Sequence, residues 1–353
     1  MKKFTLLFTF IFSILVAHSQ NVVFKDPIFK KALLDNPLIN LNKNTEIEMS
    51  EAKAPVKLKL RSKKITDLSG IENFVSLNEL DVSFNNLTKL DVSKLKSLKK
   101  LSCEKNAITT LVLPNTNTLK GLFCKNNQLT TISLTKLTLL QDLHLSSNKF
   151  TTVDLSANIN LSTLFIDDNL LTNLDLSKNK SLTDLHCDRN QLTVLDLSNN
   201  TSLNSITCIK NVLNELKLNS QNLVTLDCQN NKLKSLDVDS CAQLILLRCN
   251  NNELTFISFS QTQTCIMEEL YCNNNNLSAI DISALERLKK LIINKNNFKE
   301  LNISHNLDLE NFVFGNNPIE ILCISHAQND RANSGNWVIP TGVKMLKNCA
   351  PKK

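Results

Sequence analysis

The chain has 353 residues, of which 62 are Leu and 49 are Asn, whereas Gly occurs 5 times and Tyr and Trp once each. This bias is unlike that of an ordinary globular domain, and a hydrophobic content of 42% excludes intrinsic disorder. The formal net charge of +7 is too small and too scattered to indicate nucleic-acid binding. One apolar and one amide residue that recur this often indicate a short unit copied many times.

Residues 1–19 have the layout of a secretory signal peptide. Lys2 and Lys3 give a positive start, an apolar stretch covers residues 4–16, and small residues suit cleavage near Ser19-Gln20. A buried or membrane-spanning helix is the alternative, but the apolar run is short and no other long one follows. We therefore expect a secreted or periplasmic/extracellular protein without membrane insertion.

Residues 20–56 are predicted to form a helical cap. Asp26-Pro27 is a favourable helix start, with Asp as the N-cap and Pro in the first turn. The residues expected to face the core are Ile28, Phe29, Ala32 and Leu33.

Residues 40–51 have the spacing of an EF-hand loop, but the three early ligands are neutral Asn and the turn Gly is replaced by Thr45. We favour a vestigial loop that folds by Asn side-chain bonding, with calcium binding as the alternative. The candidate ligands are Asn40, Asn42, Asn44, Glu46 and Glu51.

Residues 57–319 divide into lines that share the pattern L-x-x-L-x-[CLVI]-x-x-N-x-L, followed by a T-x-L-D-L-S-like stretch. Lys63 takes the Asn position in a degenerate first line, so the pattern predicts 13 coils. The Asn column, mostly 21 residues apart, is Asn85, Asn106, Asn127, Asn148, Asn169, Asn190, Asn211, Asn231, Asn252, Asn275, Asn296 and Asn317.

These lines resemble leucine-rich repeats of the secreted bacterial, internalin-like kind, over roughly three quarters of the chain. The resemblance implies an α/β-type solenoid dominated by β, a horseshoe with a parallel concave sheet and 13 coils of about 21 residues, capped at both ends. It also implies recognition of a protein through the concave face. The fold hosts many unrelated partners, so it does not identify one.

Physical chemistry leads to the same coil. The alternation in Leu80-Asp81-Val82 is typical of a strand with Leu80 and Val82 pointing inward. One coil cannot bury its apolar face, whereas stacked coils share one core. The Asn column fits buried turns, because an Asn side chain offers both donors and an acceptor to unpaired backbone groups. We therefore assign these Asn residues a structural role.

The cysteines fall into three groups. Within the C-terminal cap, residues 320–353, we predict a Cys323–Cys349 disulfide rather than free thiols, because export favours it and similar proteins often end in a Cys-bounded segment. Cys241 and Cys265 lie in successive coils, and their pairing stays open. The inward strand position holds seven cysteines that we interpret as small core hydrophobes: Cys103, Cys124, Cys187, Cys208, Cys228, Cys249 and Cys272.

No motif indicates catalysis. His186 precedes Cys187, but adjacent strand residues point to opposite faces, so they cannot form a dyad. His144 and His186 lie two coils apart with Phe165 between them, which disfavours a shared metal ion. We predict a protein that is not an enzyme and has no metal and no cofactor.

Binding specificity is expected to depend on the residue four positions before each Asn of the column, because this residue faces outward at mid-strand. Consecutive coils place aromatic and imidazole rings there, and carboxylates surround them. We predict a partner-binding patch centred near Phe165, because aromatic side chains are common at recognition sites. The alternative is that the rings only stack and stabilise the solenoid. The predicted residues are Phe123, His144, Phe165, His186, Asp142, Asp167, Asp184, Asp188, Arg248 and Tyr271.

Three functions are compatible with this patch. The first is recognition of a protein partner, and the second is glycan binding, since sugars stack on aromatic rings and need acceptors for their hydroxyls. The third is a structural or adhesion spacer. Histidines among carboxylates also predict that acidification toward pH 5 changes partner affinity.

Overall fold

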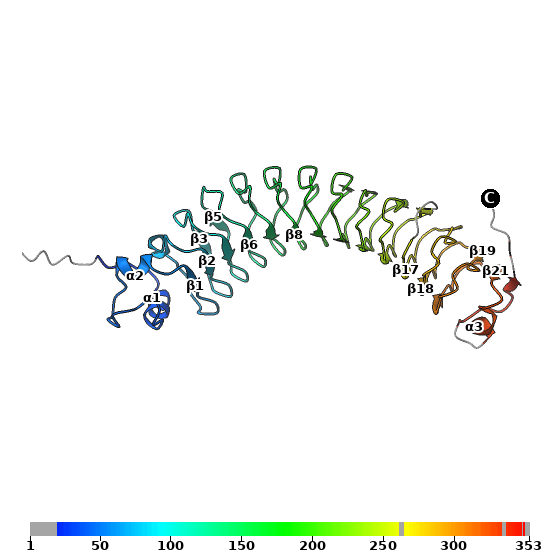
Figure 1. Cartoon of the computed structure of the whole chain (residues 1–353), viewed down its shortest axis with the longest axis horizontal. Helices are drawn as coiled ribbons and strands as arrows, with labels where there is room; N and C mark the ends of the chain where they lie inside the picture. Colours follow the sequence, from blue (N-terminus) through cyan, green and yellow to red (C-terminus); the bar gives the residue numbers. More distant parts are fainter. Residues whose placement is uncertain (1–19, 261–264, 334–336, 348, 350–353) are drawn as a thin grey trace, which may run out of the picture.

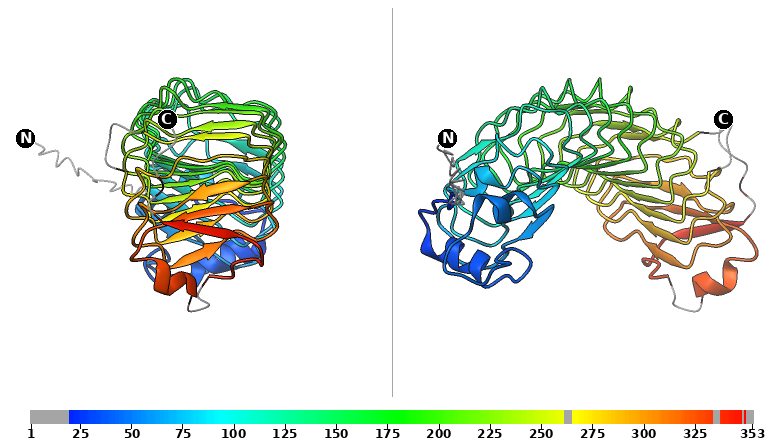
Figure 2. Two further views of the ribbon diagram at one scale, coloured as in Figure 1. Left: turned by 90° about the vertical axis from the view of Figure 1, so that its right-hand side faces the viewer. Right: turned by 60° about the vertical axis from the view of Figure 1, so that its left-hand side comes forward.

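The computed structural model describes residues 20–260, 265–333, 337–347 and 349, so the predicted leader at 1–19 lies outside the described residues. The coils stack into an arc with a cap at each end (Figure 1). Views from two other directions show the strands of successive coils running side by side (Figure 2).

The inner side of the arc is one parallel sheet, which contains 13 strands among the described residues. Successive strands pair without offset, so that Leu80 lies opposite Leu101. The 13 coils and the parallel concave sheet predicted from the repeat are confirmed. The strands are β1 (Lys57–Lys59), β2 (Glu79–Asp81), β4 (Lys100–Ser102), β6 (Gly121–Phe123), β7 (Asp142–His144), β8 (Thr163–Phe165), β9 (Asp184–His186), β11 (Ser205–Thr207), β13 (Thr225–Asp227), β15 (Leu246–Arg248), β17 (Glu269–Tyr271), β18 (Lys290–Ile292) and β20 (Asn311–Val313).

Strands on the outer side pair only in groups of two or three in the described part of the chain. Inner strands stay about 4.8 Å apart throughout, whereas the outer side is not held together in this way. The continuous sheet is therefore the concave side. The outer strands are β3 (Lys89–Asp91), β5 (Thr110–Val112), β10 (Val194–Asp196), β12 (Glu215–Lys217), β14 (Ser235–Asp237), β16 (Phe256–Ser258), β19 (Glu300–Asn302), β21 (Ile321–Ile324) and β22 (Lys344–Lys347).

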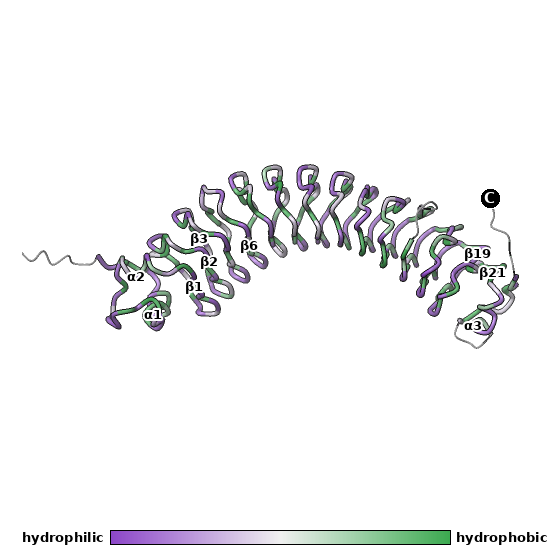
Figure 3. Tube along the Cα trace, in the orientation of Figure 1, coloured by the Kyte–Doolittle hydropathy of each residue, from purple (hydrophilic) through white to green (hydrophobic). Residues whose placement is uncertain are grey.

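One apolar core runs through the interior of the solenoid, between the inner and outer strands of the coils. Hydrophobic and hydrophilic residues alternate along each coil (Figure 3). The seven inward cysteines are fully buried in this core as free thiols. Burial raises the pKa of the thiols of Cys187 and Cys249, so these groups stay protonated and act as small hydrophobes. Cys241 and Cys265 are also buried free thiols.

The side chains of the Asn column form hydrogen bonds with the backbone groups of the turn that follows each concave strand. The Asn190 Nδ2 donates to the carbonyl oxygens of Ile166 (3.0 Å) and Cys187 (3.2 Å), and its Oδ1 accepts from the Leu171 N–H (3.1 Å). The preceding residue, Arg189, has a φ of 49°, which turns the chain inward. Asn190 thus joins its own turn to the previous coil.

A second column of buried Asn residues lies in the T-x-L-D-L-S-x-N stretch. It was not predicted from the sequence. Asn158, Asn179 and Asn200 are fully buried. The Asn200 Nδ2 donates to the carbonyl oxygens of Leu176 (3.0 Å) and Asn179 (2.9 Å), and Asn179 bonds the coil before it in the same way. The signal was present as an Asn two residues after the Ser of D-L-S. This column joins successive coils on their outer side.

The N-terminal segment forms helix α1 (Pro27–Leu34), helix α2 (Met49–Lys53) and, after β1, the 3-10 helix η1 (Ile71–Asn73). As predicted, Asp26 caps α1 and accepts hydrogen bonds from the Ile28 and Phe29 N–H groups. Phe29 and Leu33 are buried, but Ile28 is 43% exposed, contrary to the prediction. Phe29 and Leu33 are four residues apart on one face of the helix, whereas Ile28 lies on its flank.

Asp26 also joins the cap to the first coil. Its second carboxylate oxygen accepts from the Thr66 N–H (2.6 Å) and hydroxyl (2.8 Å) and from the Asp67 N–H (3.2 Å). Burial acts to raise the pKa of Asp26, but these hydrogen bonds outweigh it and hold the pKa at about 2. The carboxylate therefore stays charged and bonded at any pH above about 3.

The EF-hand-like loop closes on itself. The Glu51 carboxylate accepts from the Leu41 N–H (2.8 Å) and the Glu48 N–H (3.0 Å), and Glu46 pairs with Lys30 (2.7 Å). The Asn42 and Asn44 side-chain oxygens accept from backbone N–H groups two residues later, and the Asn40 Nδ2 donates to the Leu34 and Asn44 carbonyls. Backbone donors thus occupy most of the oxygens considered as calcium ligands.

The C-terminal segment continues from β21 through helix α3 (Asn329–Asn333) to β22, which pairs with β21. The buried Trp337 packs edge-on against Phe312 at 5.6 Å between ring centroids, and its Nε1 donates to the Glu310 carbonyl (3.2 Å). Cys323 and Cys349 form a disulfide. These contacts close the end of the apolar core. Residues 350–353 lie outside the described residues.

Candidate functional site

The outward mid-strand residues form one row across the concave sheet. Strand register places Phe123 opposite His144, His144 opposite Phe165, and Phe165 opposite His186. Their ring centroids are 4.6, 4.4 and 4.3 Å apart in the same order, and all three pairs are tilted. We call these four side chains the aromatic row. Contacts of this kind stabilise by about 0.5–1.5 kcal/mol each.

The aromatic row is less exposed than the sequence suggested. All four rings are only partly exposed, because each ring covers its neighbours. The Phe123 ring also lies over Gly121, where an added Cβ would come within 2.8 Å of it. The rings therefore both stack and face the concave side, so the stacking considered as an alternative coexists with an accessible surface.

Phe165 lies at the centre of nine outward side chains on three strands and the segments that directly follow them. Thr163 precedes it on β8 and Asp167 follows just after the strand, and the two flanking coils place matching residues on each side. Each of these side chains is partly exposed, and the nine include four carboxylates and no Lys or Arg. We call this set the Phe165 patch: Asp142, His144 and Ser146 from the first coil, Thr163, Phe165 and Asp167 from the second, and Asp184, His186 and Asp188 from the third.

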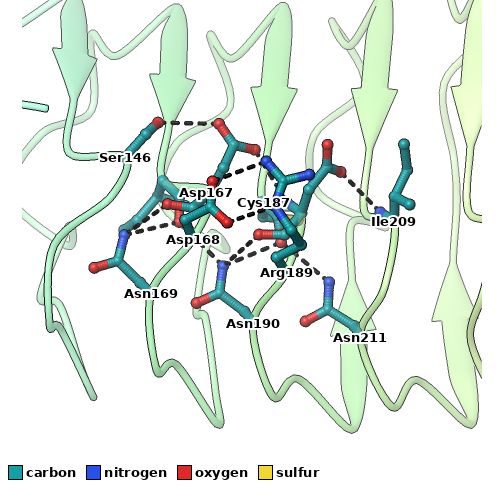
Figure 4. A network of polar contacts seen from close by, with 11 residues as sticks. Ser146, Asp167, Asp168, Asn169, Cys187, Arg189, Asn190, Ile209 and Asn211 are labelled. Carbon is teal, nitrogen blue, oxygen red and sulfur yellow. Dashed lines mark hydrogen bonds and ion pairs between the residues drawn. The ribbon is translucent and has the colours of Figure 1, made fainter. Parts of the chain in front are cut away.

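The four carboxylates of the patch differ in their partners. Asp167 accepts from the Asp188 N–H and the Ser146 hydroxyl (both 3.0 Å), and Asp188 accepts from the Ile209 N–H (2.8 Å) (Figure 4). Asp184 accepts from the Thr183 hydroxyl (2.7 Å). The Asp142 carboxylate has no hydrogen bond or ion pair with another residue in the described ranges. Asp142 is therefore the carboxylate most available to a partner.

One cation near the patch was missed from the sequence. Arg189 forms a two-pronged ion pair with Asp168, and both residues lie in the turns after β8 and β9 (Figure 4). These two residues immediately precede Asn169 and Asn190, outside the alternating outward positions from which the patch was predicted. Arg189 neutralises Asp168, and no cation of the described residues forms an ion pair with the four carboxylates of the patch.

The surroundings of the patch shift the pKa values of two of its side chains, Asp188 and His144. Burial raises the pKa of Asp188, and the nearby Asp167 adds to the effect. Burial also lowers the pKa of His144, against the attraction of Asp142. At neutral pH the patch therefore combines a carboxylate whose charged form is disfavoured by burial with an uncharged imidazole.

Replacing Asp188 by Asn is expected to raise the free energy of unfolding at pH 7 by about 0.5–1 kcal/mol, the scale of one cross-strand like-charge contact. The amide oxygen can still accept from Ile209, while the buried charge beside Asp167 is removed. Because the folded-state pKa of Asp188 is raised, the wild type regains this stability as the pH falls from 7 toward the unfolded-state pKa of about 4. Urea unfolding at pH 7 and pH 4 measures both values. An equal gain at the two pH values would contradict the electrostatic cause.

Arg248 and Tyr271, the other two predicted contact residues, form a separate group. The Arg248 guanidinium lies 5.3 Å from the Tyr271 ring centroid and 3.7 Å from the Asp227 carboxylate. Lys290 lies 5.0 Å from the same ring on its other side, and the Tyr271 hydroxyl donates to Glu269 (2.7 Å). Strand β15 is four strands from β8, roughly 19 Å along the sheet, so the ten predicted residues form two groups.

The residues considered for catalysis are not brought together. His186 is partly exposed on the concave face, whereas Cys187 is fully buried in the core. In the part of the chain that the structure describes, no three His, Cys, Asp or Glu side chains are grouped to hold a metal ion. A cavity of about 440 Å³ lies near the N-terminal cap, between residues 66 and 94, away from the aromatic row. Every described helix is too short or too polar to cross a membrane.

Comparisons with solved structures place the arc among known repeat proteins. The internalin InlF from Listeria monocytogenes is 18% identical, with 94% of this chain and 97% of that chain covered and a TM-score of 0.57. The functional domain of InlJ from Listeria monocytogenes, described as including a cysteine ladder, is 27% identical over 79% of this chain and 70% of that chain, with a TM-score of 0.49.

A third neighbour is the Toll–Spätzle complex from Drosophila, at 17% identity and a TM-score of 0.59, with 78% of this chain and 41% of that chain covered. No protein-family model matches the chain, and no curated protein sequence does. The structural neighbours include a bacterial internalin, and the chain has the leucine-rich-repeat fold that its resemblance to internalin-like proteins implied.

Proposed function

We propose that the chain is an exported, non-catalytic recognition protein that binds a protein partner through its concave face. The observation that carries the proposal is the aromatic row, four rings in register on a sheet face that no other described element covers. Aromatic side chains contribute large contact area at small entropic cost and dominate many interfaces. Residues 1–19 would be the leader, 20–56 the N-terminal cap, 57–319 the repeats and 320–353 the C-terminal cap.

The shape of the face favours a macromolecular partner over a small molecule. The concave sheet is broad and continuous, and 13 coils easily offer the ~800 Å² per partner of a standard interface. A complex of similar fold, Toll with Spätzle, joins two proteins. The spread of the predicted residues into two groups roughly 19 Å apart also suits a protein better than one sugar ring.

The test is a quantitative pull-down with the mature protein and the Phe123→Ala/Phe165→Ala variant. We expect the variant to retain at most about a tenth of each specific partner, because an aromatic anchor contributes about 2 kcal/mol or more to binding. The matched control is Val194→Ala/Phe256→Ala, which removes two exposed apolar side chains from the outer side. Circular dichroism checks that all forms fold equally.

Equal capture by the wild type and the Phe123→Ala/Phe165→Ala variant would show that the concave site is assigned wrongly. A glycan array probed with the same proteins separates the second function. Glycan binding that depends on the two Phe residues, without any protein captured, would replace the proposal by the glycan alternative.

A further inference from the structure

We infer that the partner presents a Lys or Arg side chain to the Phe165 patch, where the cation lies against the Phe165 ring and between carboxylates. This inference rests on the proposed function and specifies the chemistry that the concave site recognises. It follows from a comparison of the aromatic rings that have Lys or Arg side chains of the chain against them with the Phe165 ring.

Three other partly exposed aromatic side chains, two on the concave strands and one in a turn, each lie against cations of the chain itself. Arg61 and Lys105 lie 3.9 and 4.7 Å from the centroid of Phe84, a turn residue after β2. Lys100 lies 4.9 Å from the centroid of Phe123. Tyr271 lies between Arg248 and Lys290, as described above. Such contacts contribute about 0.5–1 kcal/mol at exposed positions.

Phe165 differs from these three rings. Among the described residues no Lys or Arg lies over its ring, and its neighbours in the row are the imidazoles of His144 and His186. The Phe165 ring is partly exposed, so one part of its surface faces the concave side without a cation. A partner can supply there the contact that the chain makes internally at Phe84, Phe123 and Tyr271.

The charges around Phe165 favour a cation and disfavour other ligands. Asp142 and Asp184 flank Thr163, so their carboxylates lie on either side of the approach to the ring, about 9–10 Å apart by strand spacing. Neither carboxylate pairs with a cation in the described structure. Asp167 and Asp188 add negative charge on the opposite side of the ring. The chain as a whole carries +7, so general attraction of a cation to the protein cannot replace this local complementarity.

The two histidines make the site sensitive to acid. His144 faces Asp142 on its own strand, Phe123 and Lys125 on one side, and Phe165 and Asp167 on the other. His186 has Asp184 on its own strand and Asp188 just after the strand. Phe165 and Asp167 lie on one side of it, and Thr207, whose hydroxyl lies 3.3 Å from its Nδ1, lies on the other. Both imidazoles contact the Phe165 ring. Burial keeps His144 uncharged at neutral pH, so its protonation on acidification places positive charge beside an incoming cation and weakens its binding.

The test measures binding of fluorescein-labelled hexalysine to the mature protein by fluorescence anisotropy at pH 7.5 and low salt. The patch variant is Asp142→Asn/Phe165→Leu/Asp184→Asn, which preserves size and removes the ring and two charges. We expect roughly tenfold weaker binding, as the loss of one cation–π contact and two ion pairs predicts. Hexapeptides of acetyl-lysine and of glutamate are expected not to bind, because they lack the cation.

The control variant is Asp154→Asn/Asp175→Asn/Phe256→Leu, which makes the same changes at exposed positions outside the concave sheet. We expect its affinity for hexalysine to stay within about twofold of the wild type. Equal weakening by both variants, or equal binding by the wild type and the patch variant, would overturn the inference. If the triple variant folds poorly, the Phe165→Leu variant is used alone, because it is altered only at one partly exposed position. It too is expected to bind hexalysine more weakly than the wild type, and equal binding would overturn the inference.

Acidification provides an independent readout. Lowering the pH from 7.5 to 5 should weaken hexalysine binding several-fold, and His144→Gln/His186→Gln should remove most of this dependence. A profile that stays unchanged in this double variant would assign the pH effect to the carboxylates and contradict the role of the histidines.

Failure of this inference can be told from failure of the proposed function. If the Phe123→Ala/Phe165→Ala variant loses its partners but hexalysine does not bind the wild type, the concave site stands and its cation specificity is wrong. If hexalysine binds the patch but the Phe123→Ala/Phe165→Ala variant captures as much partner as the wild type, the cation site is real and the proposed function is wrong.

Discussion

Replacing Asn190 by Ala is expected to lower the free energy of unfolding by about 2–4 kcal/mol, since a buried polar group left unpaired costs about 1–3 kcal/mol and each lost hydrogen bond about 0.5–1.5 kcal/mol. The variant leaves the N–H of Leu171 without its partner inside the solenoid. It also removes one of the two Asn donors from the carbonyls of Ile166 and Cys187, which keep the hydrogen bonds from Asn169 and Asn211. Neighbouring coils share these bonds, so the effect should spread to both. Guanidinium unfolding followed by circular dichroism measures it.

The control for Asn190 is Asn199→Ala. Asn199 is exposed on the outer side and is expected to change stability by less than about 0.5 kcal/mol. A loss below about 1 kcal/mol at Asn190 would mean that water enters the turn and replaces the amide, and the structural role of the column would then be wrong.

Removing the Cys323–Cys349 disulfide by Cys349→Ser is expected to destabilise the C-terminal cap by about 3–4 kcal/mol, because the bond closes a loop across 26 residues. The repeats should be affected much less, since each coil of a solenoid contacts only its neighbours. Trp337 is the only Trp of the chain and lies in the cap. Its fluorescence therefore reports on the cap, while far-ultraviolet circular dichroism reports on the whole solenoid.

We expect Cys349→Ser to move the fluorescence transition to lower denaturant and to leave most of the circular dichroism transition in place. A reducing agent should reproduce the shift in the wild type and have no further effect on the variant, because the other nine cysteines are already free thiols. Coincident, unshifted transitions would show that the disulfide does not hold the cap.

The repeat explains why so much of the fold was predictable. Each coil must bury the same inward positions and make the same buried turn after its concave strand, so Leu, Asn and Cys recur at fixed positions and their register is visible in one line of sequence. The same register correctly placed Phe123, His144, Phe165 and His186 in one row. Asp26 as the cap of α1 was equally local, because capping depends on residues two and three positions away.

Other features depended on side chains that meet across coils. Arg189 pairs with Asp168 of the previous coil, and Ile28 lies on the flank of its helix rather than in the core. The column of Asn158, Asn179 and Asn200 was hidden among exposed Asn residues of the same stretch. These outcomes are set by neighbours about 21 residues away or by how an element rests on the core.

By itself, the sequence determined the solenoid, its 13 coils, the inward columns and the row of side chains that faces the concave side, because strand alternation and a constant coil length act locally and repeat. Only the tertiary structure decided how that row is used. It showed the rings covering one another and gave Asp167 and Asp188 partners within the chain, whereas no cation of the described residues lies against Asp142 or the Phe165 ring. The reason is that exposure and pairing of an outward side chain depend on the coils on both sides of it.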